Sequence, residues 1–204
     1  TLVLEGPQSL DDLEALANAN FSEIKSNGLE KVKITEPLYY PEHQQKWISV
    51  TPVRNDQQLI ISFAMPSIEE YYRQKPESIL AYLIGHEGPG SILSLLKSKQ
   101  WALGLTAGSG INGSNFKDFN ISISLSEMGA ININEIISIV FAYINLLKKA
   151  PLNEQYYKEK KALAELSFCY QEKLSPLDSV SQLVINMQHY PEIDYIFGDY
   201  VMEG

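Results

Sequence analysis

A glycine-rich break between two helical patterns is the feature that most constrains the fold of this chain. Residues 85–90 read Gly-His-Glu-Gly-Pro-Gly, and apolar residues recur at helical spacing on both sides of them. Pro76 suits the first position of the upstream helix, and Ser91 or Gly90 can cap the downstream helix. Glycine costs ordering entropy, and a helix break leaves backbone amides that need partners. The break therefore predicts either close packing of two helices or a ligand that uses the free amides.

Strand and helix patterns surround this break along the whole chain. Apolar and alternating segments predict strands over residues 1–4, 47–53, 59–65, 101–109 and 116–125. Helical spacing predicts helices from Ser9 to Asn27, from residue 68 or 76 to 84, from Ser91 onward, and over 131–149, 153–173 and 177–189, with a short helix possible at the end. Strands that come first and helices that gather later indicate an α+β domain, whose mostly antiparallel sheet has helices packed on one face.

Net charge, apolar runs and cysteine content limit which partners and which compartment this chain can have. The net charge of −9 argues against nucleic acid or an anionic membrane surface as a partner, and it favours basic ligands. No apolar run is long enough for a membrane span, and no signal peptide is visible, so we expect a soluble protein, cytoplasmic or periplasmic. The single cysteine, Cys169, excludes an intramolecular disulfide, and its helical surroundings predict a core-packing role.

The residues give no catalytic constellation. His43, His86 and His189 are too far apart in sequence to form a metal motif. The adjacent side chains of His86 and Glu87 would diverge by about 100° on a regular helix. The glycines of residues 104–113 are not followed by the Lys-Ser/Thr pair of a phosphate loop. We therefore predict no catalytic residue and no metal ligand in this chain, which by itself should be inactive.

The run over residues 85–91, with residues 96–99 and Trp101 after it, resembles the second domain of the insulin-degrading enzyme and pitrilysin family. Further matches, in the same order, are residues 9–13, 21–24, 71–72, 120–126 and 189–191. The resemblance therefore covers essentially the whole chain.

This resemblance implies a fragment of a zinc metalloendopeptidase that degrades peptides and small proteins. Residues 1–28 would be the last strand and helix of a preceding homologous domain, 29–45 a linker, and 46–204 most of a second, non-catalytic domain. The family's H-x-x-E-H zinc motif is absent here, so the zinc would be held by sequence upstream of Thr1. The implied partners are peptide substrates, the upstream catalytic domain and the C-terminal half of the same polypeptide.

The resemblance also implies where a substrate would be anchored. The family holds the N-terminal segment of its substrate on a helix break and a facing strand, which here correspond to Tyr82, Gly85, Glu87, Leu105, Thr106, Ala107, Gly108 and Ser109. A strand of small residues can accept an extended peptide by edge pairing, and a carboxylate such as Glu87 can bind a free α-ammonium group. The chain departs from the family at Ser78 and Tyr82, where some members have histidines, and its strand lacks the family's valine and double glycine.

Three other interpretations remain open from the sequence. The break can simply be a turn that seats two helices. The chain can belong to a structural, non-peptidase relative, similar to the core subunits of the respiratory bc1 complex, which sequence upstream of Thr1 would reveal. It can also be a stand-alone peptide-binding module, which binding by the isolated chain would reveal.

Overall fold

The computed structural model describes residues 1–203 except 26, 30–31, 54–55 and 151–152. Contacts divide the chain into two compact units, Ile34–Lys160 and the pair of segments Thr1–Lys33 and Lys161–Gly204. The larger unit holds the sheet and the glycine-rich break. The domain boundaries expected from the sequence stay predictions.

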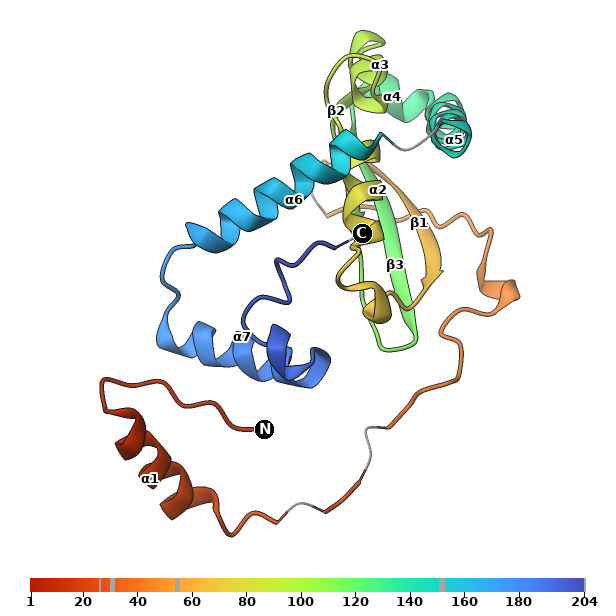
Figure 1. Cartoon of the computed structure of the whole chain (residues 1–204). Helices are drawn as coiled ribbons and strands as arrows, with labels where there is room; N and C mark the ends of the chain where they lie inside the picture. Colours follow the sequence, from red (N-terminus) through yellow and green to blue (C-terminus); the bar gives the residue numbers. More distant parts are fainter. Residues whose placement is uncertain (26, 30–31, 54–55, 151–152, 204) are drawn as a thin grey trace. The chain divides into compact units, whose positions relative to one another are not determined.

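A three-stranded antiparallel sheet forms the centre of the larger unit (Figure 1). Its strands are β1 (Gln58–Pro66), β2 (Ala102–Ser109) and β3 (Phe116–Leu125), in the order β1-β3-β2. The central strand β3 alternates half-buried and buried residues along its whole length, as a strand with one face on a core should. Three of the predicted strands are therefore confirmed, and β1 and β2 form the two edges.

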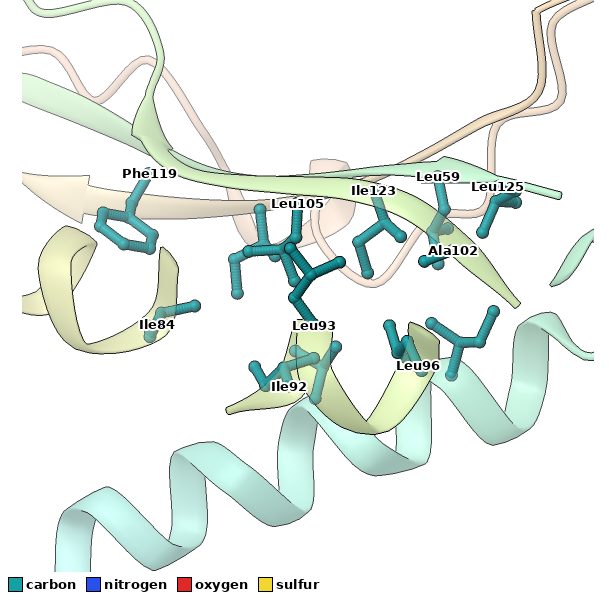
Figure 2. Close-up of a cluster of buried hydrophobic side chains, with 13 residues drawn as sticks. Leu59, Ile84, Ile92, Leu93, Leu96, Ala102, Leu105, Phe119, Ile123 and Leu125 are labelled. Atoms are coloured by element: carbon teal, nitrogen blue, oxygen red, sulfur yellow. The ribbon is translucent and has the colours of Figure 1, made fainter. Parts of the chain in front are cut away.

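Helices cover one face of this sheet, which confirms the α+β class. They are α2 (Pro76–Gly85), α3 (Ile92–Ser98), α4 (Glu127–Ile131) and α5 (Ile133–Lys149), with a 3-10 turn η2 (Glu69–Tyr71) before α2. Figure 2 shows the core between strands and helices, in which side chains of β3 point toward those of α3. The residues with the least exposure are Ile92, Leu93, Leu96, Ile121, Ile123, Ile136 and Val140.

Two predicted strands are wrong. Residues 1–4 and 47–53 have no strand conformation, and apolar side chains in the second segment, such as Trp47, Ile48 and Val50, are mostly exposed. A strand is stable only when its backbone groups pair with a neighbour, and among the described residues neither segment has one. Sequence propensity alone therefore overestimated the sheet.

The helical predictions need smaller corrections. The segment over 131–149 is preceded by the separate short helix α4, because Ser126 caps it by accepting from the Gly129 amide at 3.0 Å. The helix predicted over 153–173 ends earlier, as α6 (Glu154–Cys169). Cys169 lies at its exposed end, so the predicted core-packing role is wrong.

The smaller unit contains α1 (Leu10–Phe21), the C-terminal part of α6, α7 (Pro176–His189) and the turn η3 (Glu192–Asp194). A hydrogen-bond network holds its C-terminal segment against α7. The buried Asn186 amide donates to the Tyr195 carbonyl at 2.9 Å and to Asp199 at 3.0 Å, while Tyr190 also donates to Asp199. A buried amide whose bonds are satisfied fixes this turn in one conformation.

A segment that the sequence predicts as linker packs beside the start of β3. The ring of Tyr39 meets Phe116 edge to face at 6.2 Å, and Asn115 donates to the Glu36 carbonyl at 2.5 Å. A hydrogen bond to Asp118, with smaller effects of burial and of the Asp118 charge, raises the pKa of the Tyr39 hydroxyl. These contacts precede a short 3-10 turn, η1 (Pro41–His43).

Candidate functional site

The helix break is a closed turn that uses several of its own backbone groups. Helix α2 ends at Gly85, His86 is extended, and the Ser91 amide donates to the Gly88 carbonyl at 3.1 Å. Gly90 has φ +84, a left-handed conformation that suits glycine. Ser91 then caps α3 by accepting from the Ser94 amide at 3.0 Å. The turn therefore places the exposed side chains of His86 and Glu87 between two packed helices.

The Ser91 cap gives a first testable prediction. Ser91 is buried, so Ser91→Ala would remove the acceptor of the Ser94 amide at a place where water cannot easily replace it. We expect the free energy of unfolding to fall by about 1–2 kcal/mol. Urea denaturation measures the change.

Ser175→Ala is the matched control for this prediction, because Ser175 caps α7 in the same way but is exposed. It should cost less than Ser91→Ala, since water can hydrate the freed amide. Equal losses would show that burial adds nothing to the cap of α3.

Strand β2 runs beside the break and touches it through small residues. A Cβ atom on Gly85 would lie 3.8 Å from the Cβ and backbone nitrogen of Ala107, which is ordinary contact distance. Gly108 has φ +93, and a Cβ there would lie 2.6 Å from the Cβ of Ala81. Small residues on both elements therefore allow helix α2 to approach the backbone of β2.

The predicted strand residues face different surroundings. Leu105 is buried in the core, Ala107 and Gly108 are half-buried, and Thr106 is exposed on the opposite face. On its inner side β2 pairs with β3, and among the described strands nothing pairs with its outer side. The pairing is interrupted after Ala107, where the register passes from Ala107↔Ile121 to Ser109↔Asn120 and leaves Gly108 as an extra residue.

Tyr82 belongs to an aromatic cluster. Its ring centroid lies 5.9 Å from that of Tyr156 and 6.3 Å from that of His86, and the Lys160 ammonium lies 5.4 Å above it. These contacts join α2 to the start of α6. Tyr82 thus has a packing role beside the break, whatever it contributes to a ligand.

Glu87 is available to solvent. Its side chain is 69% exposed, and its carboxylate lies 3.7 Å from the Lys97 ammonium. An exposed ion pair of this kind is weak, because water screens it and both side chains lose freedom in forming it. A cationic ligand could therefore exchange with Lys97 at little cost.

Tyr143 of α5 fixes the end of α2. Its hydroxyl donates to the Leu83 carbonyl at 3.1 Å, one of the carbonyls in the last turn that lacks a helical partner. Burial, and secondly the neighbouring Tyr156, raise the pKa of this hydroxyl above its ordinary value. The C-terminal end of α2 is thereby held where the break begins.

Sequence reasoning missed an ion pair at the other end of α2. The Lys117 ammonium lies 3.1 Å from a carboxylate oxygen of Glu77, and the side chains are only 8% and 18% exposed. The signal was present: counting back by two from Ile123, Ile121 and Phe119 reaches position 117, so this lysine lies in the core-facing row of β3.

The described parts of the chain offer no group of side chains for a metal. There, no three side chains of His, Cys, Asp or Glu come together in a way that could bind a metal ion. These residues therefore offer no ligand set for a zinc ion, which the resemblance assigns to sequence upstream of Thr1. The same residues include no helix both long and apolar enough to span a bilayer.

Comparison with known proteins decides the family. Residues 1–163 match the family model described as the peptidase M16 inactive domain. The chain belongs to the peptidase M16 family. This agrees with the absence of a catalytic constellation from the sequence, and with the resemblance to insulin-degrading enzyme and pitrilysin.

Curated relatives extend the match to almost the whole chain. Nardilysin of Rattus norvegicus is 36% identical over 209 residues, covering 99% of this chain and 18% of nardilysin. The A-factor-processing enzyme of Saccharomyces cerevisiae is 35% identical over 182 residues, covering 89% and 18%, and human insulin-degrading enzyme is 32% identical over 198 residues, covering 97% and 19%. The chain thus spans about a fifth of the length of these M16 relatives, in which it corresponds to one part of a larger protein.

Solved structures show the same fold. Pitrilysin matches with a TM-score of 0.83 at 22% identity, over 97% of this chain and 21% of pitrilysin. The first half of the periplasmic protease PqqL from Escherichia coli matches with a TM-score of 0.59 at 12% identity, over 95% and 43%.

Proposed function

We propose that this chain is the non-catalytic region of a zinc metalloendopeptidase that degrades peptides and small proteins. In this proposal the chain forms part of a chamber wall and anchors the N-terminal segment of the substrate. The observation that carries it is the edge position of β2 beside an exposed carboxylate, Glu87, at the helix break. The similarity to nardilysin and insulin-degrading enzyme supports the peptidase assignment over a purely structural relative.

The physical basis is strand addition. An extended peptide that pairs with the outer side of β2 would form main-chain hydrogen bonds regardless of its sequence. Among the described strands, β3 alone pairs with β2, which leaves the outer edge of β2 for such a guest, while Ala107 and Gly108 face α2. Leu105 would contribute only backbone groups, because its side chain lies in the core.

The negative charge of Glu87 at the break would set the direction in which the peptide binds along β2. A free α-ammonium group that reaches Glu87 would replace the Lys97 ammonium and form a charge-assisted hydrogen bond. The net charge of −9 would add a general attraction for basic peptides.

The zinc and the groups that activate water would come from parts of the polypeptide outside this chain. The upstream catalytic domain and the C-terminal half of the same protein would complete the chamber. The role of this chain is then to bind and orient the peptide, which lowers KM and raises the share of peptides held in a cleavable position.

The test uses Glu87→Gln in the full-length protein. We expect peptides with a free N-terminus to bind about 5-fold to 30-fold more weakly to the variant, since one charge-assisted hydrogen bond is lost. N-acetylated peptides should bind equally to both proteins, because they have no ammonium group. Fluorescence anisotropy with matched free and acetylated peptides measures both.

The control variant is Glu127→Gln, which removes an exposed charge in the first turn of α4. It should change neither class of peptide beyond the general charge effect. If Glu87→Gln weakens free and acetylated peptides equally, Glu87 is no part of the anchor. If neither peptide binds the unaltered protein, the structural, non-peptidase interpretation gains, whereas binding by the isolated chain favours a stand-alone module.

A further inference from the structure

We propose that the ion pair between Glu77 and Lys117 positions the bulged end of β2, and so sets how far a docked peptide can pair along that strand. This inference rests on the proposed peptide-binding function. Glu77 and Lys117 lie outside the predicted anchor and do not touch the substrate. They would influence specificity by positioning the strand that does.

The ion pair links three pieces of chain at one point. Lys117 belongs to β3, and Glu77 lies in the first turn of α2. The Lys117 ammonium also donates to the Gly110 carbonyl at 3.4 Å, just after β2 ends. One side chain therefore ties the end of β2 to both the neighbouring strand and the helix.

The tied segment contains one of the two irregularities in the pairing of β2 with β3; the other lies at the start of β2, between Ala102 and Gly104. Gly108 is the extra residue of the bulge, with φ +93, and a Cβ on it would lie 3.9 Å from the Glu77 carboxylate. Gly110 has φ +150, and a Cβ there would collide with the Asp118 carbonyl. The backbone at this end of β2 thus depends on contacts with α2 and β3 for its course.

Stability does not explain why charges occupy this place. Lys117 is the one buried lysine among the described residues, at the end of a row that is otherwise Phe119, Ile121, Ile123 and Leu125. Removing two charges from water is costly, and a well-packed apolar pair in such a position is commonly as stable as the ion pair or more so. What an apolar pair would lack is the directed hydrogen bond to Gly110.

The consequence concerns the outer side of β2. Backbone groups can pair with a guest strand only while they keep extended geometry. With the ion pair in place, the backbone of β2 keeps one conformation through Gly108. Without it, usable pairing should stop at Ala107.

The experiment compares the full-length protein with the double variant Glu77→Leu/Lys117→Met, which replaces both charges and leaves neither unpaired. Binding is measured for a free peptide and for a series with one N-methyl group at each successive position. The unaltered protein should show weaker binding at alternate positions, as a paired edge requires. In the double variant we expect the unmodified peptide to bind about 3-fold to 10-fold more weakly. The N-methyl group at the peptide position that pairs beyond Ala107 should no longer weaken binding.

Two control variants and one independent measurement accompany this comparison. Lys117→Arg keeps a donor for Glu77 and Gly110, so it should retain the full pattern. Glu154→Leu/Lys158→Met removes an exposed ion pair from α6 and should also leave the pattern intact. Hydrogen exchange on the unaltered protein gives an independent measure, in which peptide binding should slow exchange in residues 108–110.

The outcomes separate the two proposals. An alternating pattern in the unaltered protein that persists unshortened in the double variant would overturn this inference and leave the proposed function standing. The inference also fails, with the proposed function intact, if peptide binding protects residues 104–107 from exchange but not 108–110. Absence of any alternating pattern in the unaltered protein would overturn both.

Discussion

Gly108→Ala is expected to lower the free energy of unfolding by about 2–5 kcal/mol. Its φ of +93 costs a residue with a side chain about 1–2 kcal/mol. The new Cβ would also lie 2.6 Å from the Cβ of Ala81, and overpacking of this kind costs about 1–3 kcal/mol. Relief requires α2 and β2 to separate, so peptide binding on β2 should fall together with stability. Urea denaturation and anisotropy measure the two effects.

Gly90→Ala is the matched control, because Gly90 has a similar φ of +84 but no atom within 4 Å of the added Cβ. It should cost only the conformational part, about 1–2 kcal/mol. If the two variants lose equal free energy of unfolding, the added Cβ at Gly108 meets no steric clash. The close approach of Gly108 to Ala81 would then be wrong.

Leu96→Ala is expected to cost about 2–5 kcal/mol, which makes it the other large effect. Leu96 is fully buried in the core between α3, α5 and the sheet, with 0% exposure (Figure 2). Removing three carbons there loses hydrophobic burial and leaves a cavity that packed neighbours cannot fill completely. Thermal and urea denaturation both report the loss.

The neighbouring Leu95 supplies the control, since it lies on the same helix but is 43% exposed. Leu95→Ala removes the same atoms with similar helix propensity and should cost about 1 kcal/mol or less. A loss as large as that of Leu96→Ala would show that α3 packs with a different face toward the core.

Much of the local structure could be predicted because its causes lie close together in sequence. Ser91 precedes an apolar helical pattern and does cap α3. The alternation from Phe119 to Leu125 predicted β3 and its buried face, since side chains of a strand point to opposite sides in turn. The break over residues 85–90 likewise ends one helix and precedes another.

Predictions failed where the outcome depended on a distant partner. Residues 47–53 have strand propensity, yet among the described residues no strand pairs with them. Cys169 fits a helical pattern, but the helix ends there and leaves it exposed. For the candidate site, the family resemblance indicated Glu87 and β2. The alternation of β3 places Lys117 in its core-facing row, but nothing in the sequence shows that Glu77 is its partner, so the ion pair was missed.

The sequence by itself determined which segments are helix and which are strand over most of the larger unit, and where the helices break. Periodicity, capping and glycine placement act over a few residues, so they can be recognised without a structure. Only the tertiary structure decided that Gly108 faces Ala81 and that Lys117 meets Glu77. Those contacts arise because the sheet and α2 bury a shared apolar surface, and that burial brings together residues whose local patterns are independent of each other.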